Sequence, residues 1–538
     1  MKATKVLSVK NYSLKIDHKN VLSNISFELG KGEILGIVGE SGSGKSLTAL
    51  SILKLLNIRN SKSSGEIFFN GNSISQLEES EIKKIRGNEI SIVFQEPMSS
   101  LNPSMKCGHQ ISEIILNHEK ISTASSKIKS LELIRKVKLS NPNKIYEKYP
   151  HELSGGQQQR IMIAIAIACK PKLLITDEPT TSLDSIVKNE ILSLIKSLQS
   201  EFKMSVIFIS HDLNLISKFV DNILILRNGK IVEKGRVKNI FKSPKNEYTL
   251  KLLSSNPPKK NRPYRLLNSN SIKTKLISTK QRKENHKIIY DQNPILEIKN
   301  ISVSYANLTI LNNISFDLFK GEVLGIVGES GSGKSTIAKC ILGLIQLING
   351  KILFSSENIF HIKNSIFRKK IQLIFQDPYS SLNPEMSIGD SIVEPMIVHK
   401  IFSTKEEMKL KALALLSQVG LSESDYYKFP DQFSGGQRQR IVIARALVLN
   451  PEIIVCDESV SALDVSIQAE ILNLLNDLKE KHNLTYIFIS HDMSVIKYFT
   501  DRVIVLNKGN IIELNETDAL FKSPKNDYTK ALLKASNF

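Results

Sequence analysis

The chain has 538 residues, 41% of them hydrophobic and 23% charged, so it can fill a substantial core and is long enough for two large domains or about three smaller ones. Its formal net charge is +20, but 59 of the 73 basic residues are Lys and only 14 are Arg, the residue suited to forked recognition of bases and phosphates. The composition therefore excludes a disordered chain. It favours a compositional bias with a general attraction to acidic surfaces, including anionic lipid headgroups, over nucleic-acid binding.

No stretch of the sequence is suited to crossing a membrane or to forming a disulfide framework. Apolar runs fall short of the roughly 18 residues that a spanning helix needs, and the start of the chain has no apolar segment of a secretory signal. Cys107, Cys169, Cys340 and Cys456 lie far apart with no C-x-x-C pair, which argues against disulfides and against a cysteine-bound zinc or iron–sulfur site. We expect a soluble protein of the reducing cytosol.

The first elements are an antiparallel sheet, a buried strand, a glycine-rich loop and a helix. Residues 7–30 alternate apolar and polar positions between short turns, which predicts antiparallel strands. The apolar run I-L-G-I-V then leads into G-x-x-x-x-G-K-[ST], whose glycines let backbone N–H groups surround phosphate oxygens at the positive end of the next helix. The Lys of such a loop reaches the β- and γ-phosphates, and the last Ser ligates Mg²⁺. The loop consists of Gly39, Glu40, Ser41, Gly42, Ser43, Gly44, Lys45 and Ser46.

Paired carboxylates end a second apolar strand further along the chain. The roughly 58 residues between Gln95 and Ser154 lack strand-like runs and are expected to be helical. L-L-I-T then precedes Asp177 and Glu178; the first carboxylate suits a Mg²⁺ shell, and the second is placed to polarise an attacking water. V-I-F-I-S before His211 is a third apolar strand. Buried strands interleaved with helices predict a parallel, helix-covered α/β sheet.

The whole pattern occurs twice. G-I-V-G-E-S-G-S-G-K-S stands at Gly36–Ser46 and again at Gly325–Ser335, and the later motifs follow in the same order at offsets that drift only from 289 to 280 residues. So long a repeat indicates a duplicated domain rather than a solenoid. The second copy supplies the loop residues Gly328, Glu329, Ser330, Gly331, Ser332, Gly333, Lys334, Ser335 and Thr336, and the carboxylates Asp457 and Glu458.

The segment 256–293 between the copies has a different character. It contains N-P-P-K-K-N-R-P-Y-R and K-Q-R-K-E-N-H-K, with a large excess of positive charge and little periodic apolar pattern. This composition is typical of a solvated spacer, with a binding arm as the alternative. We therefore expect two domains with short tails, at 1–255 and 294–538, joined by a basic flexible linker at 256–293.

At this point the sequence resembles the ABC ATPases. The decisive motif is S-G-G-Q, which follows Leu153 in the first copy and Phe433 in the second. The resemblance implies an α/β fold of two tandem P-loop NTPase domains, each with a parallel-sheet core, an antiparallel β subdomain and a helical subdomain. It also implies ATP and Mg²⁺ as cofactors and ATP hydrolysis as the activity.

The resemblance assigns further residues to roles in catalysis and metal binding. The catalytic set would be Glu178, Gln95 and His211 in the first half, and Glu458, Gln376 and His491 in the second. The Mg²⁺ ligands would be Ser46, Gln95 and Asp177, and correspondingly Ser335, Gln376 and Asp457. The aspartates that couple the two domains would be Asp184 and Asp464.

In this family each ATP is held between the phosphate loop of one domain and the S-G-G-Q motif of the other. A single chain with both halves could therefore form both sandwiches internally. Because both halves retain the loop, the catalytic Glu, the S-G-G-Q motif and the His, we expect two hydrolysis-competent sites. The S-G-G-Q residues are Ser154, Gly155, Gly156 and Gln157, and Ser434, Gly435, Gly436 and Gln437.

The two halves differ where the family stacks an aromatic side chain on adenine. Tyr305 occupies that place in the second half, whereas the ungapped alignment puts Ile16 there in the first. Tyr12 is an alternative in the first half. We otherwise expect the first site to hold the base by apolar contact alone.

Within the family, the closest resemblance is to the ATPase subunits of oligopeptide/dipeptide importers. F-Q-E-P-M-S-S-L-N-P, Y-P-H-E-L-S-G-G-Q and the tails F-K-S-P-K-N-E-Y-T and F-K-S-P-K-N-D-Y-T carry it, and the halves look like the two distinct subunits of such importers. The second half departs in Asp431 and Gln432, where the pattern favours His-Glu. The cysteine-rich tail of some members is absent, so no iron–sulfur cluster is expected.

Two other classes of tandem ABC protein are alternatives. Translation factors that act on the ribosome also have two ATPase halves and a basic linker, but they typically carry N-H-L-D where this chain has T-S-L-D and S-A-L-D. DNA-repair ABC ATPases would need zinc-binding cysteines. The motifs therefore favour the importer motor.

An importer motor without membrane spans requires separate partners. The resemblance implies two integral-membrane permease subunits, docked near residues 95–118 and 376–399, and an extracytoplasmic solute-binding protein. It places the chain at the cytoplasmic face of the inner membrane as a peripheral subunit. No nucleic-acid partner is expected. Peptides are the family default as cargo, with nickel, peptide antibiotics and other small solutes open.

Overall fold

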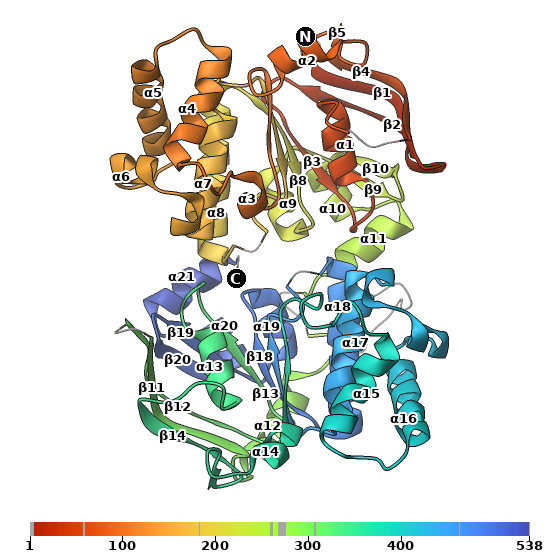
Figure 1. The fold of residues 1–538 in the computed structure, drawn as a ribbon, viewed down its shortest axis with the longest axis vertical. Coiled ribbons are helices and arrows are strands. Elements are labelled where there is room, and N and C mark those ends of the chain that lie inside the picture. The colour runs from red at the N-terminus through yellow and green to blue at the C-terminus, as the bar shows by residue number, and fades with distance from the viewer. Residues whose placement is uncertain are drawn as a thin grey trace. The chain divides into compact units, whose positions relative to one another are not determined.

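The computed structural model describes residues 5–56, 60–181, 183–258, 262–266, 276–305, 308–461, 463–536 and 538. The chain forms two compact units (Figure 1), unit 1 comprising Met1–Leu183 and Val187–Leu253, and unit 2 comprising Asp184–Ile186 and Ser254–Phe538. Each unit repeats the same succession of sheets and helices, as the sequence repeat predicts.

An antiparallel sheet stands at the front of each unit. In unit 1 its strand order is β2-β1-β4-β5, and in unit 2 it is β12-β11-β14-β15. Val9 lies opposite both Phe27 and Ile67, so apolar residues of three strands meet on one face, as alternating patterns require. The strands are β1 (Lys5–Ile16), β2 (Lys19–Gly30), β4 (Ser61–Phe69), β5 (Asn72–Ser73), β11 (Leu296–Tyr305), β12 (Leu308–Leu318), β14 (Asn349–Phe354) and β15 (Glu357–Asn358).

The second sheet of each unit is parallel apart from one edge strand. The order is β10-β9-β3-β8-β7-β6 in unit 1 and β16-β17-β18-β13-β19-β20 in unit 2. The central strands are buried along their whole length because helices and the front sheet cover them. The strands are β3 (Ile34–Val38), β6 (Ile90–Val93), β7 (Leu173–Asp177), β8 (Ser205–Ile209), β9 (Asn222–Arg227), β10 (Lys230–Arg236), β13 (Val323–Val327), β16 (Ile371–Ile374), β17 (Ile453–Asp457), β18 (Thr485–Ile489), β19 (Arg502–Asn507) and β20 (Asn510–Glu516).

A helical subdomain is inserted between β6 and β7, and its counterpart between β16 and β17, as the strand-free sequence predicts. Its packing needs glycine at one point, because a Cβ on Gly108 would lie 2.1 Å from the Tyr146 ring; Gly389 and Tyr426 repeat this at 2.3 Å. The helices are α3 (Pro97–Ser100), α4 (Cys107–His118), α5 (Thr123–Lys136), α6 (Pro142–Glu147) and α7 (Gly155–Ala166), and in unit 2 α15 (Ile388–Val398), α16 (Lys405–Gln418) and α17 (Gly435–Leu447).

The remaining helices accompany the sheets and form the tails. They are α1 (Lys45–Ile52), α2 (Glu79–Ile85), α8 (Ser185–Phe202), α9 (Leu213–Phe219), α10 (Val237–Lys242), α11 (Glu247–Ser254), α13 (Lys334–Ile341), α14 (Asn364–Lys370), α18 (Val465–His482), α19 (Met493–Phe499), α20 (Thr517–Lys522) and α21 (Asp527–Ala535). In the described part of the chain, no helix combines the length and apolarity needed to cross a bilayer. All four cysteines are free thiols.

The expectation of a flexible, solvated linker is wrong for part of 256–293. Residues 279–290 form α12 (Thr279–Tyr290), whose first turn is capped because Ser278 Oγ accepts a hydrogen bond from the Gln281 amide. Arg282 and His286 are buried against unit 2, with which this segment is grouped. Ion pairs with acidic residues of unit 2 provide the physical reason. Residues 259–261 and 267–275 of the segment lie outside the described residues.

Candidate functional site

The glycine-rich loop of each unit joins a central strand to a helix, as predicted. Gly44 has a φ of 100° and caps the start of α1. The Lys45 ammonium is buried and donates hydrogen bonds to the carbonyl oxygens of Gly39 and Glu40, at 2.8 and 3.0 Å. Lys334 makes the same bonds to Gly328 and Glu329, at 2.9 and 2.7 Å. Both loops are therefore folded around their lysine.

Glycine is required at the loop ends by close backbone approach. A Cβ on Gly39 would lie 2.3 Å from the Leu226 carbonyl oxygen, and one on Gly44 would lie 2.5 Å from Leu22 Cδ2. Both distances are below any van der Waals contact, so a side chain at either position would displace the loop. The observed loop shape therefore depends on glycine at both positions.

The first carboxylate of each pair is buried beside the loop serine. A hydrogen bond joins Asp177 to Ser46, and burial, outweighing that bond, raises the pKa of the Asp177 carboxyl. Among the described residues, nothing hydrogen-bonds to Asp177 Oδ1 or to Asp457 Oδ1, although both atoms are buried. A buried carboxylate oxygen without a partner is costly, and carboxylate plus hydroxyl oxygens are ligands that Mg²⁺ prefers. These residues therefore fit a Mg²⁺ ion.

The second carboxylate gathers the other predicted catalytic side chains. Glu178 Oε2 accepts hydrogen bonds from Gln95 Nε2 at 3.1 Å and Thr181 Oγ1 at 3.0 Å, and it lies 3.0 Å from His211 Nδ1. In unit 2, Gln376 and His491 each lie 3.2 Å from Glu458 Oε2. Residues more than 80 positions apart thus converge on one oxygen in each unit.

The charge states of this cluster suit its chemistry. Burial by itself raises the pKa of Glu178, but the hydrogen bond and positive charge of His211 outweigh burial and bring that pKa below its ordinary value. The pKa of Glu458 is lowered in the same way by His491. Burial lowers the pKa of His211, yet its hydrogen bond and attraction to Glu178 raise that pKa overall. Each glutamate is therefore ionised at neutral pH and can accept a proton.

The S-G-G-Q motif begins a helix in each unit. Ser154 Oγ accepts a hydrogen bond from the Gln157 amide at 3.4 Å, and Gln157 Oε1 accepts one from the Ser154 amide at 3.1 Å. Ser434 and Gln437 form the same capping box. A Cβ on Gly156 would lie 2.6 Å from Val187 Cγ1. The motif is thus a rigid helix start, made by contacts within its own unit.

The candidates for base stacking differ in how far their side chains are exposed. Tyr305 ends β11 with 49% of its surface exposed, whereas Ile16 is partly buried at the end of β1. Tyr12 is only 8% exposed and belongs to the apolar core of unit 1, so it is not available to stack on a base. Asp464 is the N-cap residue of α18, and Asp184 directly precedes α8.

Two tail tyrosines contact the phosphate loops and had no assigned role. Tyr248 Oη accepts a hydrogen bond from the Glu40 amide at 3.3 Å, and Tyr528 Oη accepts one from the Glu329 amide at 3.2 Å. Both belong to the repeated phrase F-K-S-P-K-N-x-Y-T. The repetition marked the phrase, but its contact with a loop some 200 residues away depends on the fold.

Glutamates on the edge strands hold the tails in this position. Glu233 accepts hydrogen bonds from the amides of Lys245 and Asn246, at 2.9 and 3.1 Å. Glu513 does the same in unit 2 for Lys525 and Asn526. Each tail is therefore fastened to the sheet that carries the phosphate loop.

Comparisons with known proteins agree with this geometry. The ABC transporter family matches residues 22–181 and 311–461, and the oligopeptide/dipeptide transporter C-terminal region matches residues 232–283 and 512–537. The glutathione import ATP-binding protein GsiA of Escherichia coli (strain K12) is 40% identical over 99% of this chain and 90% of its own length. The peptidoglycan transport ATP-binding protein YejF of Agrobacterium fabrum is 41% identical over 99% of this chain and 96% of its own. The chain therefore belongs to the ABC transporter family, as a tandem ATP-binding and ATP-hydrolysing importer subunit whose halves each carry the oligopeptide/dipeptide transporter C-terminal region.

Proposed function

We propose that this chain drives the uptake of peptides or related small solutes through separate membrane permeases. The observation that carries the proposal is the pair of equivalent sites, each with a buried loop lysine and a Gln–Glu–His cluster, in a chain whose tails match oligopeptide/dipeptide transporters. Relatives over the whole chain are named for glutathione import and peptidoglycan transport. The tail matches favour this function over the ribosome-associated alternative.

In each site the chain's own residues orient the phosphates and activate the water. Lys45 and the loop amides bind the β- and γ-phosphates, while Ser46, Asp177 and Gln95 would hold Mg²⁺, which neutralises phosphate charge when bound. Ionised Glu178 polarises the attacking water and accepts its proton. His211 keeps that carboxylate in place and faces the γ-phosphate. The same roles in the other half belong to Lys334, Ser335, Asp457, Gln376, Glu458 and His491.

We further propose that each ATP is completed by the opposite half. Ser154–Gln157 would meet the ATP held by Lys334, and Ser434–Gln437 the ATP held by Lys45. The start of a helix presents free N–H groups and a partial positive charge, so both capped motifs are suited to a γ-phosphate. Asp184 and Asp464 would couple the halves during closure.

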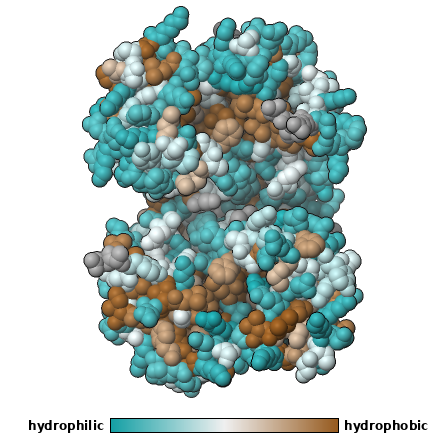
Figure 2. Space-filling view, viewed as in Figure 1, coloured by the Kyte–Doolittle hydropathy of each residue, from teal (hydrophilic) through white to brown (hydrophobic). Residues whose placement is uncertain are grey.

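The permeases would dock on the segments that follow Gln95 and Gln376, at the cytoplasmic face of the membrane. These segments expose large apolar side chains, and Figure 2 shows apolar patches among polar surface on the viewed face of each unit. Exposed apolar groups of this kind are typical of interaction sites. The exposed residues are Met98 and Leu116 in the first half, and Tyr379, Ile397 and Val398 in the second. An extracytoplasmic solute-binding protein would deliver the cargo.

A double substitution tests the motor function. Glu178→Gln with Glu458→Gln should preserve MgATP binding while abolishing ATP hydrolysis and tripeptide uptake in vesicles that contain the permeases and the binding protein. More than a few per cent of wild-type hydrolysis in that assembly would overturn the catalytic assignment. If the wild-type assembly hydrolysed ATP but took up no peptide, the cargo assignment alone would be overturned.

A further inference from the structure

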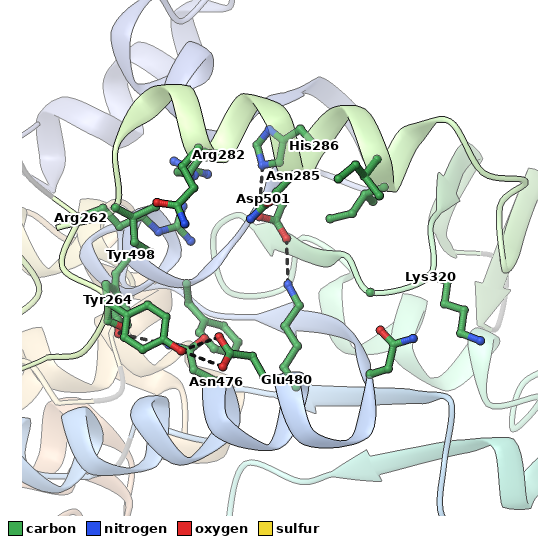
Figure 3. Close-up of a pocket in the computed structure, with 18 of the residues that line it drawn as sticks. Arg262, Tyr264, Arg282, Asn285, His286, Lys320, Asn476, Glu480, Tyr498 and Asp501 are labelled. Carbon is green, nitrogen blue, oxygen red and sulfur yellow. Dashed lines mark hydrogen bonds and ion pairs between the residues drawn. The ribbon is translucent and has the colours of Figure 1, made fainter. Parts of the chain in front are cut away.

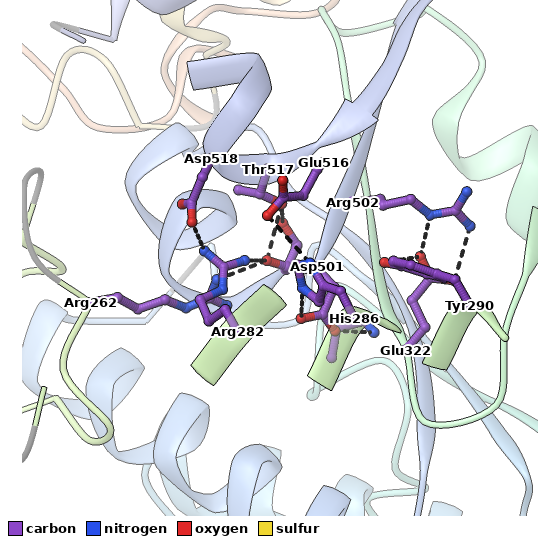
Figure 4. A network of polar contacts seen from close by, with 12 residues as sticks. Arg262, Arg282, His286, Tyr290, Glu322, Asp501, Arg502, Glu516, Thr517 and Asp518 are labelled. Carbon is purple, nitrogen blue, oxygen red and sulfur yellow. Dashed lines mark hydrogen bonds and ion pairs between the residues drawn. The ribbon is translucent and has the colours of Figure 1, made fainter. Parts of the chain in front are cut away.

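The segment between the duplicated domains contacts unit 2 through several arginines. We call residues 262–266 and 276–290 the arm. Arg282 Nη1 lies 2.5 Å from Asp518 Oδ2, and its Nη2 donates to the Thr500 carbonyl oxygen at 3.2 Å (Figure 4). Arg262 Nη1 donates to the same carbonyl at 3.1 Å. One backbone oxygen of unit 2 thus receives two guanidinium groups of the arm.

The second half of α12 continues this network. His286 lies between Asp501 and Glu516, with nitrogen–oxygen distances of 3.2 and 3.3 Å. Although burial raises the pKa of Asp501, Lys479, His286 and Arg262 together hold it well below its ordinary value, so the carboxylate is charged. Figure 4 shows these groups converging from α12 and from the region of β19 and β20.

An aromatic contact ends the helix. The Tyr290 ring packs edge-on against Phe319, with centroids 5.2 Å apart, and the Arg502 guanidinium lies 5.0 Å from the Tyr290 centroid. Arg502 is in turn paired with the fully buried Glu322 at 2.6 Å. These contacts fix the end of α12 on unit 2 by packing as well as by charge.

The other part of the arm is recognised through its backbone. Leu266 is 1% exposed and belongs to the core of unit 2. Its amide donates to Asn473 Oδ1 at 3.0 Å, and its carbonyl accepts from Asn473 Nδ2 at 2.9 Å. Tyr264 Oη donates to the Glu480 carboxylate at 2.7 Å. The arm and unit 2 together line a cavity of about 470 Å³ (Figure 3).

Unit 1 lacks many of the side chains that make these contacts, although it keeps the counterpart of Asp501 as Asp221. In this region each residue of the second half lies 280 positions after its counterpart in the first, as His491 does after His211. The carboxylates Glu516 and Asp518 correspond to Arg236 and Lys238, so the sign of the charge is reversed. The other side chains that differ are Asn473, where unit 1 has Ser193, Asp477 (Ser197), Glu480 (Ser200), Tyr498 (Lys218) and Arg502 (Asn222).

We propose that unit 2 carries a docking surface dedicated to this chain's own arm, and that the docked arm is a noncovalent latch between the first half's tail and the second half. The latch is selective because the equivalent face of unit 1 would present Arg236 and Lys238 to a basic arm. Partly buried pairs such as Arg282–Asp518, whose side chains are 7% and 37% exposed, are screened less by salt than fully exposed pairs, so the latch holds at physiological ionic strength. The exposed Arg265–Asp477 pair adds little.

Cleavage beside the arm tests the latch in the full chain. A specific protease site is inserted between Gln292 and Asn293, which are exposed, and the folded protein is cut in EDTA without nucleotide, so that ATP cannot bridge the halves. An amino-terminal tag then retains the second half only through noncovalent contacts. This arrangement makes the result independent of the transport function.

The variant Glu516→Arg with Asp518→Lys carries the residues that unit 1 has at these positions. We expect the cut wild-type halves to stay together and the cut variant to release its second half at least about tenfold faster, since the buried Arg282 loses its carboxylate partner and faces like charges instead. Asn473→Ser should give a smaller acceleration. The control variant Asp527→Lys with Glu357→Arg changes the net charge equally at exposed sites away from the arm, and should behave as wild type.

Hydrogen exchange of α12 in the uncut chains gives a second measurement that does not depend on release. The amides of α12 should be protected in wild type and control, and lose protection in Glu516→Arg with Asp518→Lys. Release of wild-type and variant second halves at equal rates, or equal protection of α12 in both, would overturn the proposal.

Discussion

The two units perform the same chemistry with nearly identical parts, yet their outer faces have diverged. Lys45 and Lys334 make the same two bonds, and Glu178 and Glu458 gather the same Gln and His. On the face that receives the arm, in contrast, Glu516 and Asp518 of the second unit are replaced by Arg236 and Lys238 in the first. Duplicated halves thus stay alike where the phosphate geometry leaves no choice. They differ on the face where only the second unit binds the arm.

The equivalence of the two catalytic clusters can be broken by single substitutions. Glu178→Gln and Glu458→Gln each remove the ionised group that accepts the proton, and general-base catalysis typically contributes about 10²–10⁴-fold. We expect each single variant to lose hydrolysis at its own site to a similar degree, measured as single-turnover ATP cleavage in the assembled transporter. Clearly unequal losses would show that only one half hydrolyses ATP.

The pairing of each loop with the opposite S-G-G-Q motif gives the next largest effect. Ser434→Arg places a bulky side chain where the ATP held by Lys45 must meet the helix start, and it should block closure and transport while ATP binding to the open site remains. Cysteines at positions 43 and 434 should crosslink within one chain, with ATP promoting the bridge. A bridge between positions 43 and 154, or only between chains, would contradict the arrangement.

The base-stacking positions predict a difference in affinity between the halves. Stacking on an aromatic side chain is worth about 1–3 kcal/mol in nucleic-acid sites, and the half-exposed Tyr305 has no aromatic counterpart, since Tyr12 is buried. ATP should therefore bind more tightly to the Lys334 site, and Ile16→Tyr should narrow the gap. Binding is measured after Lys→Ala inactivation of either loop. If the two Lys→Ala variants bound ATP with equal affinity, Tyr305 would have no role in base stacking.

The tail tyrosines give the smallest effect and test whether the loops are held alike. Tyr248→Phe and Tyr528→Phe each remove one hydrogen bond to a loop amide, which is worth about 0.5–1.5 kcal/mol. We expect a KM for ATP raised about two- to tenfold, with kcat changed less, because the loop loses positioning rather than a reacting group. The matched control for Tyr528→Phe is Lys530→Ala, which changes a side chain on the same tail that faces solvent. A KM unchanged in both tyrosine variants would show that the loop does not depend on its tail.

The sequence by itself determined the duplicated fold and the phosphate chemistry. Short buried strands, glycines at fixed spacing and carboxylates at strand ends are local patterns, and they placed Lys45, Asp177 and their counterparts where the structure has them. The convergence of Gln95, Glu178 and His211 followed from family resemblance rather than from spacing, since no local pattern brings together residues that far apart.

Only the tertiary structure decided where the basic segment goes. By composition the segment reads as solvated, because charged residues without apolar periodicity cannot bury a face of their own. What buries Arg282 and His286 is a set of carboxylates more than 200 residues away, Asp501, Glu516 and Asp518. The burial of Tyr12 and the bonds of Tyr248 and Tyr528 to the phosphate loops were likewise settled by packing. Such contacts depend on which surfaces the folded sheets and helices bring together, and local periodicity in the sequence does not predict those long-range contacts.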